Sequence, residues 1–110
     1  MSPSNNPNQE NSLIITGEVR KTPARRVSPA GVVINRFVLS HHSRQVEAGM
    51  PRQASCNITV TACGTALEDQ LRQAQAGAQV RVSGFLSSVR NRYGNEQLVL
   101  HAENIETINR

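Results

Sequence analysis

The chain has 110 residues, enough for a single domain with a small core, and it lacks the roughly 20 consecutive apolar residues of a membrane-spanning helix. Twelve lysines and arginines against eight aspartates and glutamates give a formal net charge of +4, and eleven of the twelve basic residues are arginines. Because guanidinium groups match phosphate geometry and stack on bases, this excess favours a nucleic acid or another polyanion as partner.

The N-terminal segment, residues 1–11, is polar and rich in proline and asparagine. This composition predicts a disordered tail, followed by one domain at residues 12–110. The segment has neither the basic nor the apolar region of a secretory signal, so we expect a cytoplasmic protein.

Three strands are predicted in the first half of the chain. Apolar and polar residues alternate at residues 13–20, 33–40 and 55–62, which is the period of half-buried strands. Phe37 lies on the apolar face of the second run, which predicts a core position. The segments between these runs are predicted to be loops, because residues 21–31 contain two prolines and a glycine and residues 43–53 are largely polar.

A short helix and two more strands are predicted after Gly64. Helix-forming residues at 66–77 predict a helix that ends at Gly77. The alternation at residues 80–86 predicts a fourth strand, in which we expect a bend at Gly84 and a core position for Phe85.

The C-terminal part of the sequence predicts a hairpin. Residues 87–96 are typical of a hairpin tip, with the turn at residues 93–95. The fifth strand begins at Leu98 and can continue as far as Ile108.

This order of elements favours an all-β fold. Three strands, a short helical segment and two strands follow the order of the oligonucleotide-binding (OB) fold, a five-stranded Greek-key barrel. Other small barrels share the order. In an OB barrel the ligand lies on the second and third strands and on two flanking loops.

The basic residues fall in the segments that border this ligand face. They are Arg20, Lys21, Arg25, Arg26, Arg36, Arg44, Arg52, Arg90 and Arg92. In an OB barrel they would line one groove suited to a phosphate backbone. The alternative is a solvated basic surface that only keeps the protein soluble.

Two other side chains are candidates for the same groove. Tyr93 at the hairpin tip is either a platform for a base or a turn residue that packs across its own hairpin. His42, beside His41 at the end of a strand, is a candidate phosphate contact when protonated, and the alternative for this pair is an ordinary surface position.

The two cysteines give no sign of a disulfide or a metal site. If Cys56 and Cys63 lie on one extended segment, they are roughly 23 Å apart, which is too far for a disulfide. We expect buried, reduced thiols and neither metal nor cofactor. Catalytic motifs such as a glycine-rich phosphate loop are missing, so we expect a binding protein and not an enzyme.

Four motifs are more specific than the order of strands. They are TP-x-R-[KR]-VSP-x-G at residues 22–31, FVL-x-H at 37–41, EAG-x-x-RQA-x-C at 47–56 and LVLHAE-x-IE at 98–106. With these motifs, residues 11–109 resemble the family of primosomal replication protein N (PriB). That family is similar in fold to single-stranded DNA-binding proteins.

The resemblance implies a homodimer of OB folds that binds single-stranded DNA in bacterial replication restart. The partners it implies are the helicase PriA, the helicase-loading protein DnaT and SSB. The family's basic DNA-contacting positions correspond to Arg26, Arg90 and Arg92, where lysines are usual. The full set of candidate DNA-binding residues is Arg20, Arg26, Arg36, His42, Arg44, Arg52, Arg90, Arg92 and Tyr93.

Departures from the family pattern affect mainly the stacking residues. In the best-known members of the family, a base-stacking tryptophan occupies the position of Ser55 and another aromatic residue occupies that of Met50. A basic residue is usual at the position of Gln97. We therefore expect weaker binding of single strands, with a steeper salt dependence relative to affinity. The lost aromatics favour a second hypothesis, a protein-interaction adaptor whose basic loops dock on acidic partners. RNA binding is a third, because OB barrels serve both nucleic acids.

Overall fold

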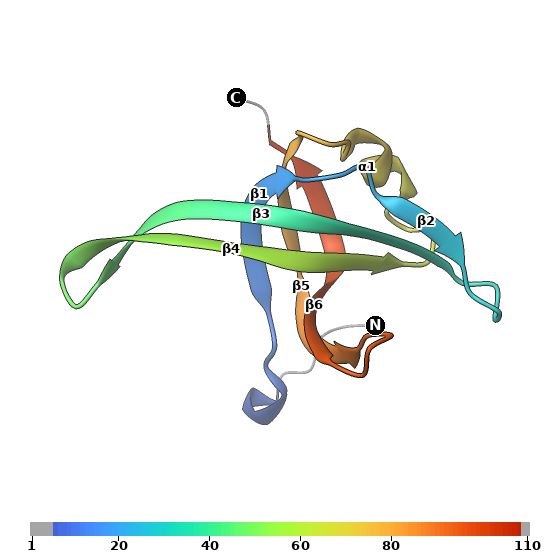
Figure 1. Ribbon diagram of the computed structural model, residues 1–110, viewed down its shortest axis with the longest axis horizontal. Coiled ribbons are helices and arrows are strands. Elements are labelled where there is room, and N and C mark those ends of the chain that lie inside the picture. Colours follow the sequence, from blue (N-terminus) through green and yellow to red (C-terminus); the bar gives the residue numbers. More distant parts are fainter. Residues whose placement is uncertain (1–5, 109–110) are drawn as a thin grey trace.

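The computed structural model describes residues 6–108 of the chain (Figure 1). In chain order its elements are the 3-10 turn η1 (Pro7–Gln9), β1 (Leu13–Val19), β2 (Ala24–Val27), β3 (Val33–Glu47), β4 (Met50–Cys63), α1 (Glu68–Gln73), β5 (Gln79–Arg90) and β6 (Glu96–Thr107). No helix among these residues has the length and apolar character needed to cross a membrane.

Five of the strands close into a barrel. The described residues form one sheet in the order β1-β5-β6-β4-β3-β2, and an additional pairing of β1 with β3 completes the circle. The β4–β6 pair is parallel. The short helix α1 lies between β4 and β5 in the chain and at one end of the barrel in space (Figure 1). The predicted five-stranded OB barrel with a short helical segment is therefore confirmed.

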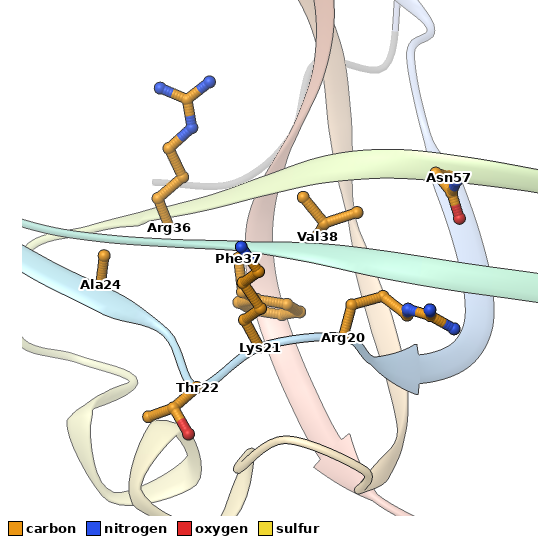
Figure 2. Close-up of a pocket in the computed structure, with 8 residues that line it drawn as sticks. All are labelled: Arg20, Lys21, Thr22, Ala24, Arg36, Phe37, Val38 and Asn57. Carbon is orange, nitrogen blue, oxygen red and sulfur yellow. The ribbon is translucent and has the colours of Figure 1, made fainter.

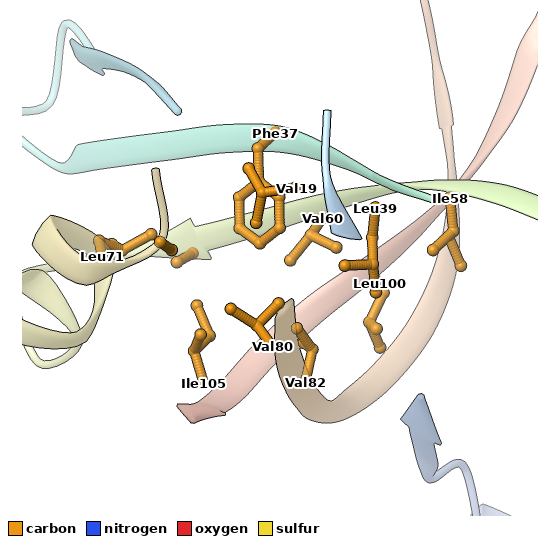
Figure 3. Packing of buried hydrophobic residues seen from close by; sticks show 12 residues of the cluster. Val19, Phe37, Leu39, Ile58, Val60, Leu71, Val80, Val82, Leu100 and Ile105 are labelled. Atoms are coloured by element: carbon orange, nitrogen blue, oxygen red, sulfur yellow. The ribbon is translucent and has the colours of Figure 1, made fainter. Parts of the chain in front are cut away.

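The core fills the inside of this barrel (Figure 3). Inward positions alternate with outward ones along each strand, as the period of two predicts. Phe37 is only 4% exposed, which confirms its predicted core position. The buried cluster comprises Val19, Phe37, Leu39, Ile58, Val60, Ala62, Leu71, Ala74, Val80, Val82, Leu100 and Ile105.

The first predicted loop contains a strand. β2 pairs with β3 from Ala24↔Arg36 to Val27↔Val33, so the prediction of an unstructured loop at residues 21–31 is wrong. β1 meets the same edge of β3 at Val19↔Leu39. After β1 leaves it, the chain returns to that edge as β2, and the two prolines lie outside the strand, where their missing N–H is harmless.

The prediction of a second loop, at residues 43–53, is also wrong. β3 and β4 pair without a break from Ile34↔Cys63 to Glu47↔Met50, so residues 43–53 form a hairpin. Its two turn residues, Ala48 and Gly49, both have positive φ, 52° and 76°, as a type I′ turn requires. We call residues 42–55 the ribbon, because this part of the hairpin extends beyond the barrel (Figure 1). A ribbon with solvent on both faces has no apolar alternation by which a sequence pattern reveals a strand.

Phe85 is not in the core as predicted. Its side chain is 41% exposed, because β5 directs Gly84 inward and Phe85 outward, opposite His101 of β6. The register of β5 against β6 shifts between Ser83 and Gly84, the glycine at which the sequence predicts a bend. A Cβ at Gly84 would lie 1.9 Å from the carbonyl oxygen of His101, so only glycine fits there.

Three smaller differences concern the helix, the last hairpin and the cysteines. α1 ends at Gln73 and not at Gly77, because Ala74 has already left helical geometry with ψ 55°. β5 and β6 leave only residues 91–95 for the predicted tip. Cys56 and Cys63 are exposed rather than buried, since Cys56 lies at the base of the ribbon and Cys63 points outward.

The segment before β1 is attached to the barrel. Residues 1–5 of the predicted tail lie outside the described residues. Farther along, Asn11 Nδ2 donates a hydrogen bond to the carbonyl of Leu86 over 2.8 Å, and the Leu86 N–H donates to Asn11 Oδ1 over 2.9 Å. The division into a tail and a domain stays a prediction.

Candidate nucleic-acid interface

The outer face of the β3–β4 pair carries polar and basic side chains. Because residues directly opposite each other on an antiparallel pair share a face, the register places Arg36 beside Thr61, His42 beside Ser55 and Arg44 beside Gln53. All lie on the side opposite the buried Phe37 and Leu39.

A hollow of about 420 Å³ lies between residues 20–24 and β3. Figure 2 shows Arg20, Lys21 and Thr22 on the segment that leaves β1, and Arg36 and Val38 on β3. This hollow therefore combines cationic side chains with an apolar wall.

Two further hollows extend this surface in both directions. One, of about 360 Å³, is lined by Arg20, Ser40, His42, Ser55, Cys56 and Asn57. The other, of about 260 Å³, is lined by Arg26, Ile34, Arg36, Thr61, Cys63, Val89, Arg90, Val99 and His101. Arg20 and Arg36 each line two of the three hollows, so we treat the three together as one track.

The arginines divide into two groups by their ion pairs. Five of them contact a carboxylate: Arg20–Glu18 at 3.8 Å, Arg25–Glu68 at 3.3 Å, Arg52–Glu47 at 3.1 Å, Arg81–Glu106 at 3.7 Å, and Arg72–Asp69. Among residues 6–108, five arginines have no carboxylate within 4 Å: Arg26, Arg36, Arg44, Arg90 and Arg92. The members of this second group lie on the track, on the ribbon's outer face and on the last hairpin, so uncompensated positive charge collects there.

A hydrogen-bond chain fixes the guanidinium at the centre of the track. Arg36 donates to Gln97 Oε1 over 3.0 Å, and Gln97 Nε2 donates to Thr59 Oγ1 over 2.7 Å. Gln97, which stands where the family pattern has a basic residue, therefore orients Arg36. No local sequence signal reveals this contact, because 61 positions separate its two residues.

The last hairpin presents two arginines and a tyrosine. Arg90 donates to the Gly94 carbonyl over 2.8 Å, and the Arg92 guanidinium lies 5.9 Å from the centre of the Tyr93 ring. Tyr93 is 78% exposed, so its ring does not pack across the hairpin. The Asn91 side chain accepts the N–H of Tyr93 and orders the turn.

Some predicted site residues lie elsewhere. Arg52 stands opposite Gln45, on the face of the ribbon away from Arg44, and is bound to Glu47. Arg25 points to Glu68 at the start of α1. The structure therefore brings together Arg20, Arg26, Arg36, His42 and Arg90, places Arg44, Arg92 and Tyr93 on the adjoining ribbon and tip, and separates Arg25 and Arg52 from them.

The two neighbouring histidines have different positions. His41 is half-buried, and its Nδ1–H donates to the Thr16 carbonyl over 2.7 Å while Nε2 lies 2.7 Å from the Ser43 hydroxyl. It links β3 to β1. His42, one residue farther, is exposed on the outer face. Only His42 is available to a ligand.

The sequence pattern missed a pair of stacked rings. The rings of Phe85 and His101 lie 4.8 Å apart at an interplanar angle of 10°. His101 is also part of the lining of the smallest track hollow. The signal for it is that Phe85 falls between the inward positions of its alternating strand. The prediction of a core position for Phe85 did not use this signal.

Comparison with known proteins identifies relatives over nearly the whole chain. Residues 11–104 match the family described as another single-strand binding protein family. The replication restart proteins PriB of Photorhabdus laumondii and Proteus mirabilis are each 47% identical over 98 residues, which cover 89% of this chain and 93% of theirs.

Solved structures agree in fold. PriB from Ralstonia solanacearum superposes with a TM-score of 0.71 at 25% identity, over 90% of this chain and 99% of that one. The single-stranded DNA-binding protein of Thermus aquaticus gives 0.74 at 20% identity over 91% of this chain and 51% of that one, and this likeness shows the fold alone. The chain belongs to the PriB family of replication restart proteins, which is built on the OB fold of single-strand binding proteins.

Proposed function

We propose that the protein is a non-catalytic, sequence-tolerant single-stranded DNA-binding factor of the replication-restart primosome, active in the cytoplasm. Its partners are then single-stranded DNA, the helicase PriA, DnaT and SSB. Family membership supports the general role. The separation of the arginines into two groups supports the DNA contact.

That separation is the observation that carries the proposal. An arginine already bound to a carboxylate has less charge to offer a phosphate, whereas an unpaired guanidinium on an open surface attracts one. The unpaired arginines lie on β2, on the outer face of β3 and on the last hairpin, beside the face where an OB barrel holds its ligand. Contacts to the phosphate backbone of DNA do not depend on the bases. We therefore expect binding to depend little on the DNA sequence.

A salt titration tests the proposal. Anisotropy of a labelled oligo-dT should show an association constant that falls linearly with salt on logarithmic axes, with a slope of about −0.7 for each phosphate contact. The double variant Arg90→Ala/Arg92→Ala should bind more weakly, with a slope reduced in magnitude by about 1.4.

Two acid-paired arginines away from the track provide the matched control. Arg72→Ala/Arg81→Ala also removes two positive charges. Both of these side chains are paired with carboxylates, and neither lines the track. We expect its slope to stay at the wild-type value. Equal slopes for the two double variants would contradict the track. An association constant independent of salt would contradict phosphate contact, and no detectable binding of oligo-dT would contradict the proposed function.

We also propose that the protein acts as a homodimer. β1 pairs with β5 along Leu13 to Glu18, but it reaches β3 only at Glu18 and Val19. Among the described residues, the other edge of Leu13 to Thr16 has no strand partner, and Ile14 on it is exposed. An open strand edge is commonly covered by pairing across a two-fold axis. Sedimentation as a monomer at micromolar concentration would contradict this.

The ribbon favours a second candidate function, that of a protein-interaction adaptor. Val46 and Met50 at its tip are exposed apolar side chains beside a surface with few stacking aromatics. An adaptor would stimulate PriA even after Arg90 and Arg92 are replaced by alanine, whereas a DNA-dependent factor would not. Competition between matched DNA and RNA oligomers separates the first candidate from RNA binding.

A further inference from the structure

We infer that Phe85 and His101 form a base-stacking platform beside the arginine track. This inference rests on the proposed function and deepens it, because it assigns a site for the bases where the track assigns sites for the phosphates. The occupant is a nucleobase of single-stranded DNA. Neither residue belongs to the set of candidates that the sequence suggested.

The platform is in line with the central arginine of the track. On the outer face of the sheet, Arg36 of β3 stands opposite Thr61 of β4, Thr61 opposite His101 of β6, and His101 opposite Phe85 of β5. Neighbouring strands are about 4.8 Å apart, so this row spans about 14 Å from Arg36 to Phe85. A strand whose phosphate meets Arg36 can therefore place a nearby base on the platform.

The rings are held in position before any ligand arrives. His101 Nε2 lies 2.5 Å from the Ser87 hydroxyl, and its ring stacks on Phe85 at 4.8 Å. The residue Phe85 nevertheless remains 41% exposed, which leaves surface free for a further ring. A fixed aromatic group loses little conformational entropy on binding, which favours it as a contact.

The surroundings match a nucleotide in both shape and charge. His101 shares the hollow of about 260 Å³ with the apolar Val89 and Val99 and with Arg26, Arg36 and Arg90. Among the described residues these three arginines have no carboxylate partner. The hollow thus offers an apolar wall for a base and positive charge for its phosphates. Phe85 itself does not line this hollow but adjoins it through its stacked partner His101, and there it offers the stacking surface that Ser55 cannot supply.

The absence of tryptophan from the chain allows a direct test. In Phe85→Trp, the introduced indole is the only tryptophan, and its emission should be quenched when oligo-dT binds, because stacking on a base quenches indole fluorescence. Phe85→Leu keeps an apolar side chain but removes the ring. We expect it to bind oligo-dT about fivefold more weakly or worse, while Phe85→Trp binds at least as well as wild type.

The salt dependence separates stacking from phosphate contact. A stacked base releases no counterions, so Phe85→Leu should keep the wild-type salt slope, in contrast to Arg90→Ala/Arg92→Ala. Unfolding midpoints of both Phe85 variants verify that they are folded, and the fluorescence of Phe85→Trp reports on the site even if Phe85→Leu is unstable.

The possible failures are distinguishable. If wild-type protein does not bind oligo-dT, both the proposed function and this inference are contradicted. If wild type binds, unchanged affinity of Phe85→Leu together with unquenched Phe85→Trp overturns the platform alone. Indole emission that changes on dilution of the protein but not on addition of DNA would show that a second copy of the chain covers Phe85, which also overturns it.

Discussion

The two halves of the β3–β4 hairpin have the same pairing but different surroundings. In the barrel half, Phe37, Leu39 and Val60 are buried on one face while the other face lines the track. In the ribbon, residues 42–55, solvent lies on both sides of most positions. The ribbon therefore depends on its ladder, its cross-strand pairs and its turn, and an isolated two-stranded hairpin is only marginally stable.

Under the proposed function, this difference gives the two halves of one long hairpin different roles in binding. The barrel half fixes Arg36 through Gln97 and so presents a preorganised contact. The ribbon carries Arg44 beyond the barrel, on strands that only the hairpin ladder supports. The same pair of strands thus has a half that packs on the core and a half that extends beyond it. The boundary between the two halves is where the core ends.

The largest expected difference is in hydrogen exchange. Barrel-half amides should exchange through global unfolding, which costs about 5–15 kcal/mol, while ribbon amides should open locally at a small fraction of that free energy. Native-state exchange followed by NMR measures both. Equal protection along the hairpin would show that something other than the ladder stabilises the ribbon.

A matched pair of valine truncations should show the same contrast in stability. Val60→Ala removes buried methyl groups from the core and should lower the free energy of unfolding by about 2–3 kcal/mol. Val46→Ala makes the same change on the exposed ribbon and should stay within about 0.5 kcal/mol of wild type. Chemical denaturation gives both values, and a loss at Val46 as large as at Val60 would place the ribbon within the cooperative unit.

Arginine truncations on the two halves should separate preorganised from mobile contacts. Each of Arg36→Ala and Arg44→Ala should reduce the magnitude of the salt slope by about 0.7 if each side chain meets one phosphate. Arg36→Ala should lose more affinity, by about 1 kcal/mol relative to Arg44→Ala, because less entropy is lost in ordering a fixed side chain. Gln97→Ala should reproduce part of the Arg36 loss with an unchanged slope, and a larger loss at Arg44 would reverse the assignment.

The smallest effect is expected at the ribbon turn. Ala48 has φ 52°, a left-handed conformation that asparagine adopts more readily than alanine. Ala48→Asn creates the Asn-Gly pair favoured in type I′ turns and should stabilise the ribbon by up to about 1 kcal/mol. Ribbon amides should then exchange more slowly while the global unfolding midpoint stays the same. A shift of that midpoint would contradict independent opening of the ribbon.

The alternating runs in the sequence predicted most of the barrel because burial on one face leaves a period of two. This held for Leu39 and Val60, which are fully buried. The pattern failed in the ribbon, where both faces of the strands are exposed to solvent. It also failed at β2, which forms because β3 has a free edge beyond its pairing with β1. It also misplaced Phe85, because an apolar side chain in a strand was assigned inward.

The sequence located several basic residues that the structure brings together, while their role in DNA binding stays a prediction. Residue type and segment were sufficient to select Arg26, Arg36 and Arg90, which line one hollow together. They were insufficient to show that the pairing register turns Arg52 to the other face of the ribbon, or that Arg25 reaches Glu68. Ion pairing between distant positions leaves no local pattern, so only coordinates show which cations are already neutralised.

The amino-acid sequence by itself determined the barrel strands, the family and the excess of arginine, since these depend on periodicity, motif and composition. Only the tertiary structure decided which arginines remain unpaired, that Gln97 holds Arg36, and that Phe85 and His101 face outward together. The reason is physical: strand register and barrel closure bring together side chains that are far apart in the chain, and neither is encoded in any single segment.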